Sequence, residues 1–88
     1  MRRIIWYSHA KERLIERGIT AQIVLAALQD PDQVIPKGKI KIIHKRYQDS
    51  LHRKEYLLRI FVEVVGVDWV IRTVYRTSKI AKYWEGKK

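Results

Sequence analysis

The stretch that decides the fold is YLLRIFVEVVGVDWVIRTVYR, residues 56–76. Two runs rich in β-branched and aromatic residues, 56–65 and 67–76, lie on either side of Gly66. Such residues favour strands, and a glycine between two strands favours a tight turn. The stretch therefore predicts a β-hairpin that forms the centre of a sheet.

The register of this hairpin follows from its pattern of apolar side chains. A two-residue turn at Gly66-Val67 and a four-residue turn over 65–68 set the same four pairs opposite each other. These pairs are Val64 with Trp69, Val62 with Ile71, Ile60 with Thr73, and Leu58 with Tyr75. This largely apolar face is expected to cover the core, because a slip of one residue would bury charged side chains instead. The opposite face is then predicted to carry Arg59, Phe61, Glu63, Arg72, Val74 and Arg76.

The residues before the hairpin predict one strand and two helices. Residues 3–7 are rich in β-branched and aromatic side chains, which indicates a short strand. Ser8 and Thr20 are good N-caps, and apolar residues follow each of them at helical spacing. We expect helices over 8–17, ended by Gly18, and from Thr20 to just before Asp30.

The pattern then alternates over 39–42 toward Tyr47, which predicts a strand that is entered through a turn at 36–38. Residues 48–54 are expected to form a polar loop, and 78–86 a short helical or irregular basic tail. The whole chain, 1–88, is predicted to be one α+β domain of order β-α-α-β-β-β-(α), with the two N-terminal helices packed on the apolar face of the hairpin.

Charge is unevenly distributed along the 88 residues, whose formal net charge is +10. Residues 1–36 contain five Lys/Arg and four Asp/Glu, whereas residues 37–88 contain fourteen and five. A basic region of this kind attracts phosphate polymers, although it can also serve solubility alone. RNA is the expected partner.

Several classes of function are disfavoured by composition. There is no cysteine, so disulfides, thiolate zinc sites and cysteine nucleophiles are excluded. We expect a soluble cytoplasmic protein without a signal peptide or membrane helix, and we expect no metal and no cofactor. His9 and Glu12 have a spacing that could bind a metal, but a salt-bridged helix surface is favoured because the neighbouring Arg13 would repel a cation.

Basic side chains elsewhere are predicted to contact RNA. Phe61 is included because it offers a stacking surface for a base. The predicted RNA-binding residues are Lys39, Lys41, Lys45, Arg46, Arg53, Lys54, Phe61, Lys79 and Lys82. The strand lysines could instead protect a sheet edge, and the tail could pack on the sheet through Trp84. His44 and His52 could be general acids or bases, or ordinary polar residues.

Two segments of the chain resemble a known group of proteins. The motif SHAKERLIERGI, residues 8–19, followed by a short helix and Asp30-Pro31, resembles an uncharacterised bacterial and archaeal domain family in the RelE-like toxin clan. The stretch VIRTVYRTSK, residues 70–79, is similar to the end of BrnT-type toxins. The resemblance covers nearly the whole chain. It implies that residues 1–88 form a single RelE-like domain, in which both N-terminal helices pack on one face of an antiparallel sheet.

The resemblance implies a toxin of a toxin–antitoxin pair, an endoribonuclease in which the RNA's 2′-hydroxyl attacks the scissile phosphate. It implies that Arg59 and Arg72 stabilise the phosphate, assisted by Arg76, that Tyr83 contributes to the site, and that an antitoxin protein is the partner. Glu63 is a candidate base on chemical grounds alone. The chain departs from the clan in having no histidine after the last strand.

Three functions therefore remain open. The first is an mRNA-cleaving toxin, acting on free or ribosome-bound RNA. The second is a binding domain for RNA or DNA without catalysis, and the third is a basic partner for an acidic protein segment.

Overall fold

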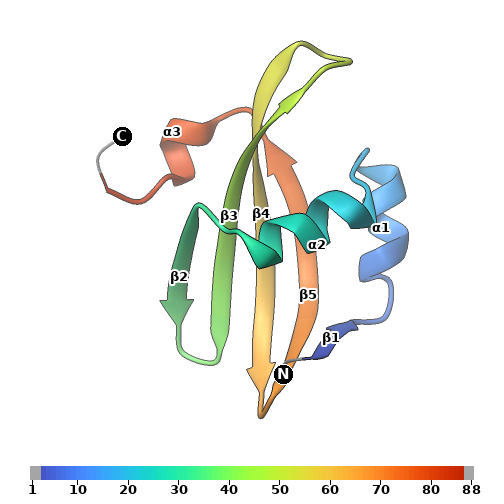
Figure 1. Cartoon of the computed structure of the whole chain (residues 1–88), viewed down its shortest axis with the longest axis vertical. Helices are drawn as coiled ribbons and strands as arrows, with labels where there is room; N and C mark the ends of the chain where they lie inside the picture. Colours follow the sequence, from blue (N-terminus) through green and yellow to red (C-terminus); the bar gives the residue numbers. More distant parts are fainter. Residues whose placement is uncertain (1–2, 87–88) are drawn as a thin grey trace.

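The computed structural model describes residues 3–86 and has an α+β fold, in which a five-stranded mixed sheet is combined with three short helices (Figure 1). The strands are β1 (Arg3–Trp6), β2 (Gln33–Lys37), β3 (Ile40–Asp49), β4 (Lys54–Val65) and β5 (Asp68–Thr77). The helices are α1 (Ala10–Glu16), α2 (Ala21–Gln29) and α3 (Ile80–Tyr83). The order across the sheet is β1-β5-β4-β3-β2.

The direction of β1 corrects one prediction. Strands β2 to β5 are joined by short turns and run antiparallel to one another, but β1 runs parallel to β5. A tight turn can join only antiparallel strands, whereas β1 is separated from β5 by most of the chain. No turn fixes its direction, so the prediction of a wholly antiparallel sheet was wrong at this edge.

The helix ends follow local signals, with one exception. The side chain of Thr20 accepts a hydrogen bond of 3.2 Å from the backbone N–H of Ile23, which confirms the predicted cap of α2. Gly18 has φ of 69°, as expected just after the end of α1. Helix α1, however, begins at Ala10, and its N-cap residue is His9 rather than Ser8. His9 has φ of 73° and makes no side-chain capping bond.

The middle segment contains one strand more than predicted, and its turns are shorter. Only one strand was expected between the helices and the central hairpin, but residues 33–37 form a separate strand, β2, which pairs with β3. Strand β2 continues through Pro36 to Lys37, and the turn to β3 follows at residues 38–39. The turn between β3 and β4 spans residues 50–53 instead of 48–54. Both hairpins are therefore extended, and β3 and β4 reach well beyond the helices at one end of the sheet (Figure 1).

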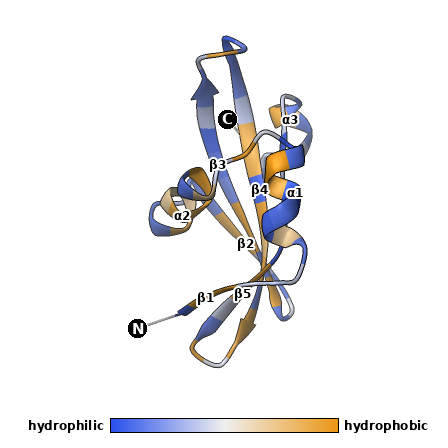
Figure 2. Ribbon diagram, turned by 90° about the vertical axis from the view of Figure 1, so that its right-hand side faces the viewer, coloured by the Kyte–Doolittle hydropathy of each residue, from blue (hydrophilic) through white to orange (hydrophobic). Residues whose placement is uncertain are grey.

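The main core lies between one face of the sheet and the two N-terminal helices, as predicted. Its buried residues come from both helices, the segment between them and three strands, and they are Leu14, Ile19, Val24, Ala27, Leu28, Ile43, Leu58, Ile60, Val62, Ile71 and Val74. Hydrophobic and hydrophilic residues mix along the long strands (Figure 2). We call this side the helix face.

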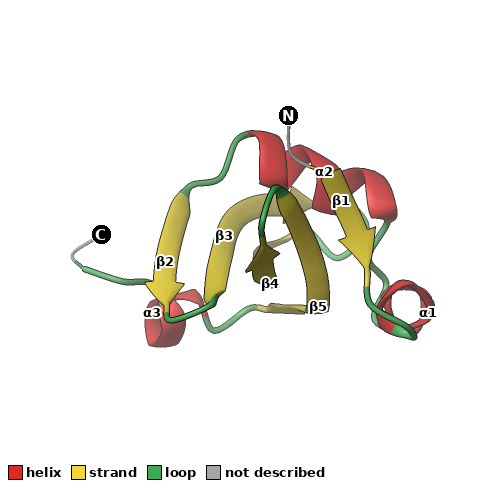
Figure 3. Cartoon of the chain, turned by 90° about the horizontal axis from the view of Figure 1, so that it is seen from below, coloured by secondary structure: helices red, strands yellow, loops and turns green. Residues whose placement is uncertain are grey.

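The other side of the sheet, which carries Arg59, Phe61 and Glu63, is called the open face. It is partly covered by α3, which lies across the sheet from α2 (Figure 3). Ile42 and Leu57 are nonetheless buried there, and so is Ile80 of α3. The C-terminal segment therefore packs on the sheet, one of the two alternatives that the sequence left open.

A β-bulge in the central hairpin corrects the predicted register. Val64 opposes Trp69 and Val62 opposes Ile71, as predicted, and the turn between the strands has two residues, Gly66 and Val67. The register then shifts between Phe61 and Val62, so that Ile60 opposes Val74 and Leu58 opposes Arg76. One additional residue in β5 reverses the faces of all residues that follow it.

The bulge changes which side chains reach the open face. Val74, predicted to lie there, is 2% exposed and belongs to the core. Arg76 moves to the helix face with Leu58, and Tyr75 takes its place on the open face opposite Arg59. Two of the six residues predicted for this face therefore lie on the other one.

Candidate nucleic-acid interface

Arg59 is the centre of an aromatic cluster on the open face. Its guanidinium carbon lies 5.2 Å from the ring centre of Phe61 and 5.5 Å from that of Tyr75. The closest ring is that of Tyr83, from α3, at 4.3 Å. Such contacts stabilise a cation by about 0.5–2 kcal/mol each, depending on how far it is desolvated. Three elements of the fold thus hold one half-buried arginine.

The rings around Arg59 also contact one another. Phe61 and Tyr75 are stacked, with their ring centres 6.1 Å apart and an interplanar angle of 18°. Tyr83 meets Tyr75 edge to face at 6.4 Å. Tyr83 was predicted as a site residue, and the structure places it against Arg59. Tyr75 was missed, because strict alternation along β5 assigned it to the core.

His44 fixes the orientation of the Arg59 guanidinium. The Nε of Arg59 donates to Nε2 of His44 at 3.1 Å, and Nη1 donates to the hydroxyl of Tyr75. Since Nε2 of His44 accepts, its proton lies on Nδ1, which is 3.0 Å from Oε1 of Gln33. His44 is completely buried, and burial, followed by the nearby charge of Arg59, lowers its pKa. A neutral imidazole suits this network because it can accept from a guanidinium.

The same network holds the C-terminal segment on the sheet. Gln33 donates from Nε2 to the carbonyl of Glu85 at 2.7 Å, and its Oε1 accepts from the Glu85 backbone N–H at 3.3 Å. Trp84 stacks on His44 with 6.3 Å between ring centres, and Arg46 lies 5.1 Å from the centre of its ring. His44 was predicted only as a surface group or a general acid or base, so its structural role went unrecognised.

Arg59 differs from the other arginines of the sheet in its charge balance. Arg72 pairs with Glu63 at 2.9 Å and lies 4.1 Å from the ring centre of Tyr7, while Arg46 pairs with Glu55 at 2.9 Å. Within residues 3–86, no carboxylate pairs with Arg59, and its Nη2 donates no hydrogen bond. Arg59 therefore offers an oriented guanidinium edge with an unneutralised charge, which is the chemistry that binds a phosphate.

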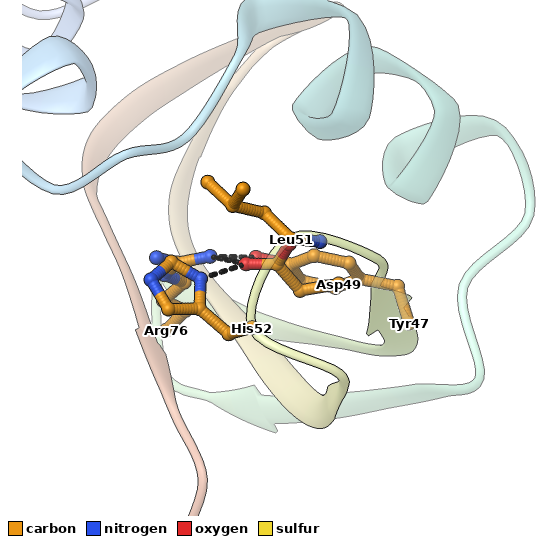
Figure 4. A network of polar contacts seen from close by, with 5 residues as sticks. All are labelled: Tyr47, Asp49, Leu51, His52 and Arg76. Atoms are coloured by element: carbon orange, nitrogen blue, oxygen red, sulfur yellow. Dashed lines mark hydrogen bonds and ion pairs between the residues drawn. The ribbon is translucent and has the colours of Figure 1, made fainter.

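Arg76 belongs to a separate polar cluster beneath the β3–β4 turn (Figure 4). Its Nη1 donates to Asp49 at 2.9 Å and to the hydroxyl of Tyr47 at 3.3 Å, and it lies 4.3 Å from the ring centre of Tyr56. Asp49 also accepts from His52 at 2.7 Å and from the backbone N–H of Leu51 at 2.9 Å. These bonds, that of His52 above all, lower the pKa of Asp49 to about 2.

The predicted RNA-binding lysines are not gathered on one face. Lys41 lies on the helix face, 5.5 Å from the ring centre of Trp69, and Lys45 lies there too, beside Asp30 and Asp32. Strand β3 lies between β2 and β4, so these lysines do not form the sheet edge that the pattern suggested. Lys39, Arg53 and Lys54 are exposed in or beside turns, and Lys79 and Lys82 are exposed on the C-terminal segment.

The described residues contain no group of three or more histidine and acidic side chains that could hold a metal ion. Nor is any helix of the described chain long and apolar enough to span a membrane. Comparisons with protein-family models, with curated proteins and with solved structures find no match to this chain. Its function must therefore be argued from the site itself.

Proposed function

We propose that the protein binds single-stranded RNA on the open face and cleaves it at the phosphate that Arg59 holds. The observation that carries the proposal is the unpaired guanidinium of Arg59, fixed by His44 and Tyr75 and surrounded by aromatic rings. Aromatic rings beside a cation are the usual means of binding single strands, because bases stack while the cation binds the backbone. A basic chain raises the local concentration of RNA.

The proposed reaction is an internal transfer of the phosphoryl group. The 2′-oxygen of the RNA gives its proton to Glu63, the candidate base, and attacks phosphorus. The bond from phosphorus to the 5′-oxygen breaks, and that oxygen takes up a proton from a general acid. The products are a 2′,3′-cyclic phosphate and a 5′-hydroxyl. Arg59 stabilises the additional negative charge that develops on the phosphate oxygens. The proposed general acid is the hydroxyl of Tyr75, which accepts a hydrogen bond from Arg59, or that of Tyr83, whose ring lies against Arg59.

A second candidate is RNA binding without cleavage, and one observation favours it. Glu63, the candidate base, pairs with Arg72 at 2.9 Å. A carboxylate that is paired with a guanidinium is a weaker proton acceptor. If Glu63 does not act as the base, the open face binds RNA but leaves the 2′-hydroxyl protonated.

The resemblance to the RelE-like clan supports a proposal for the role of this activity in the cell. We propose that the cleaving enzyme is a toxin, that its substrate is mRNA, and that a cognate antitoxin neutralises it. Induced expression in a bacterium should then arrest growth, and Arg59→Ala should abolish the arrest.

The proposal is tested by measuring binding and cleavage of a labelled single-stranded RNA. Arg59→Ala should lower the cleavage rate about 10²–10³-fold, the usual loss for one electrostatic stabiliser, with a smaller loss of affinity. Arg59→Lys keeps the charge but loses the fork, and should recover only part of the rate. The matched control is Arg3→Ala, which removes an exposed arginine that pairs with Asp68, and should cleave like the wild type.

The outcomes separate the two candidates. If the wild-type protein binds RNA but produces no cyclic phosphate, the binding-domain candidate is supported and the enzyme candidate is refuted. Wild-type protein that binds no RNA at low salt refutes both, and so does an Arg59→Ala variant that melts normally with full affinity and full activity.

A further inference from the structure

A cleft on the helix-face side of the sheet, where the end of α1 meets the end of β5, has no part in the proposed function. Its volume is about 470 Å³, and its lining includes Arg17, Tyr56, Arg76 and Ser78. Tyr56 and Arg76 lie on the helix face, whereas Arg59 lies on the open face. The cleft is therefore a site separate from Arg59, and its size is in the range of sites that bind small molecules.

Two guanidinium groups in the wall of this cleft are held by acceptors of the protein. Arg17 donates from Nη1 to the carbonyl of Val74 at 2.6 Å. Arg76 donates from Nη1 to Asp49 at 2.9 Å and to the hydroxyl of Tyr47 at 3.3 Å, and its side chain is only 17% exposed. Both cations are oriented before a ligand arrives, which lowers the entropic cost of binding.

Gly18 brings the two arginines together. It follows Arg17 in the chain, and a Cβ at this position would lie 3.1 Å from Nη2 of Arg76. The guanidinium of Arg76 therefore packs against the segment that carries Arg17. A glycine permits this approach because it has no side chain.

The cleft has more positive charge than its carboxylates balance. Asp49 balances Arg76, whereas no carboxylate in the described part of the chain pairs with Arg17. An anion that contacts both arginines is attracted by two cations and reduces their mutual repulsion. The exposed Ser78 adds a hydroxyl donor to the same cleft.

These donors suit a phosphate better than a carboxylate. Forked guanidinium groups from two directions, together with a hydroxyl, match an anion with three terminal oxygens. A terminal phosphate has a charge of about −1.5 to −2 at pH 7, whereas a phosphate within a nucleic-acid backbone has a single charge. A cleft with two arginines and one carboxylate therefore favours the terminal group.

We propose that this cleft binds a terminal phosphate, a phosphate monoester, through Arg17, Ser78 and the donors of Arg76 that Asp49 and Tyr47 leave. The remaining volume accommodates the nucleoside that carries the phosphate. Both a free nucleoside monophosphate and the 5′-end of an RNA present this group. The proposal does not depend on RNA binding or cleavage at Arg59.

The test is calorimetric titration with adenosine monophosphate, with adenosine, and with a hexanucleotide RNA that has either a 5′-phosphate or a 5′-hydroxyl. Adenosine monophosphate should bind more tightly than adenosine. Arg17→Gln removes the charge but keeps a donor for the Val74 carbonyl, and should weaken adenosine monophosphate about tenfold, as expected for one charge-assisted contact. If the source is an RNA end, the 5′-phosphate should tighten hexanucleotide binding, and Arg17→Gln should abolish this difference.

A second variant should change the affinity in the opposite direction. Asp49→Asn removes the negative charge beside Arg76 and should tighten adenosine monophosphate binding about twofold to fivefold, the range of one ion pair near the surface. Glu55→Gln makes the same change in net charge on the open face, where Glu55 pairs with Arg46, and should have no effect. An arginine at position 17 with only a structural role would not produce the increase in Asp49→Asn.

The control for Arg17→Gln is Arg13→Gln, one helical turn earlier and also exposed, which should bind every probe like the wild type. Thermal melting of each variant establishes that it is folded. The proposal is overturned if folded Arg17→Gln binds adenosine monophosphate and both RNAs like the wild type, or if Arg13→Gln loses as much affinity. Unchanged affinity in folded Asp49→Asn would also overturn it.

The Arg59→Ala variant separates this inference from the proposed function. If adenosine monophosphate binding is lost in Arg59→Ala and kept in Arg17→Gln, the nucleotide belongs to the open face and the cleft proposal is wrong. If the wild type binds adenosine monophosphate through Arg17 but binds no RNA that lacks a 5′-phosphate, only the proposed function is refuted.

Discussion

The buried imidazole of His44 should make the domain lose stability in mild acid. His44 is 0% exposed, and its pKa is lowered by burial and then by the charge of Arg59. In the unfolded chain a histidine takes up a proton near pH 6.5. As the pH falls below this value the unfolded state binds more protons than the folded state, so the free energy of unfolding decreases. One proton gives a slope of at most about 1.4 kcal/mol per pH unit.

The assay is urea unfolding at several pH values between 8 and 5. Wild-type protein should lose stability as the pH falls, whereas His44→Gln, which cannot be protonated, should give a flatter curve. Asp49 does not interfere between pH 8 and 5, because its pKa is about 2 and its contribution to stability is lost only in stronger acid. His9→Gln removes an exposed histidine and is the control. Parallel curves for wild type and His44→Gln would refute a neutral, buried His44.

Two further predictions concern the fold. Gly18→Ala should lower the free energy of unfolding by about 1–2 kcal/mol, because φ is 69° and the new Cβ would lie 3.1 Å from Nη2 of Arg76. Gly38→Ala should lower the free energy of unfolding by less, because φ is 61° but no atom lies within 4 Å of the added Cβ. Equal losses for the two variants in urea unfolding would contradict the role of Arg76. Val74→Asp should abolish cooperative thermal melting, since it places a charge in the core. Arg72→Ala should melt close to the wild type. If Arg72→Ala abolishes cooperative melting while Val74→Asp melts like the wild type, the bulge is misplaced.

The parts of the fold that the sequence predicted depend on local chemistry. A threonine before an apolar stripe caps a helix wherever it occurs, and Thr20 does so here. Gly66 between two β-branched runs gives a two-residue turn, which sets the first pairs of the hairpin. The site at Arg59 was also predictable, since its place beside Phe61 follows from the alternation of β4 alone.

What the sequence did not reveal depends on contacts between distant segments. The parallel pairing of β1 with β5 and the packing of Trp84 on His44 join residues far apart in the chain. The bulge left a weak signal, because Ile71 and Val74 are three residues apart and cannot both face the core of a regular strand. Burial of His44 had no such signal, since a histidine among lysines looks like a surface residue.

The bulge determines which arginines can take part in the proposed chemistry. In a regular β5, Arg76 would share the open face with Arg59, and two cations would flank a phosphate there. The bulge instead gives Arg76 to Asp49 and brings the Tyr75 hydroxyl to Arg59. A guanidinium that is already paired must exchange a carboxylate for a phosphate, whereas Arg59 need not. In the proposed function, the positive charge available to RNA is therefore set by the few arginines left without a carboxylate rather than by the net charge of the chain.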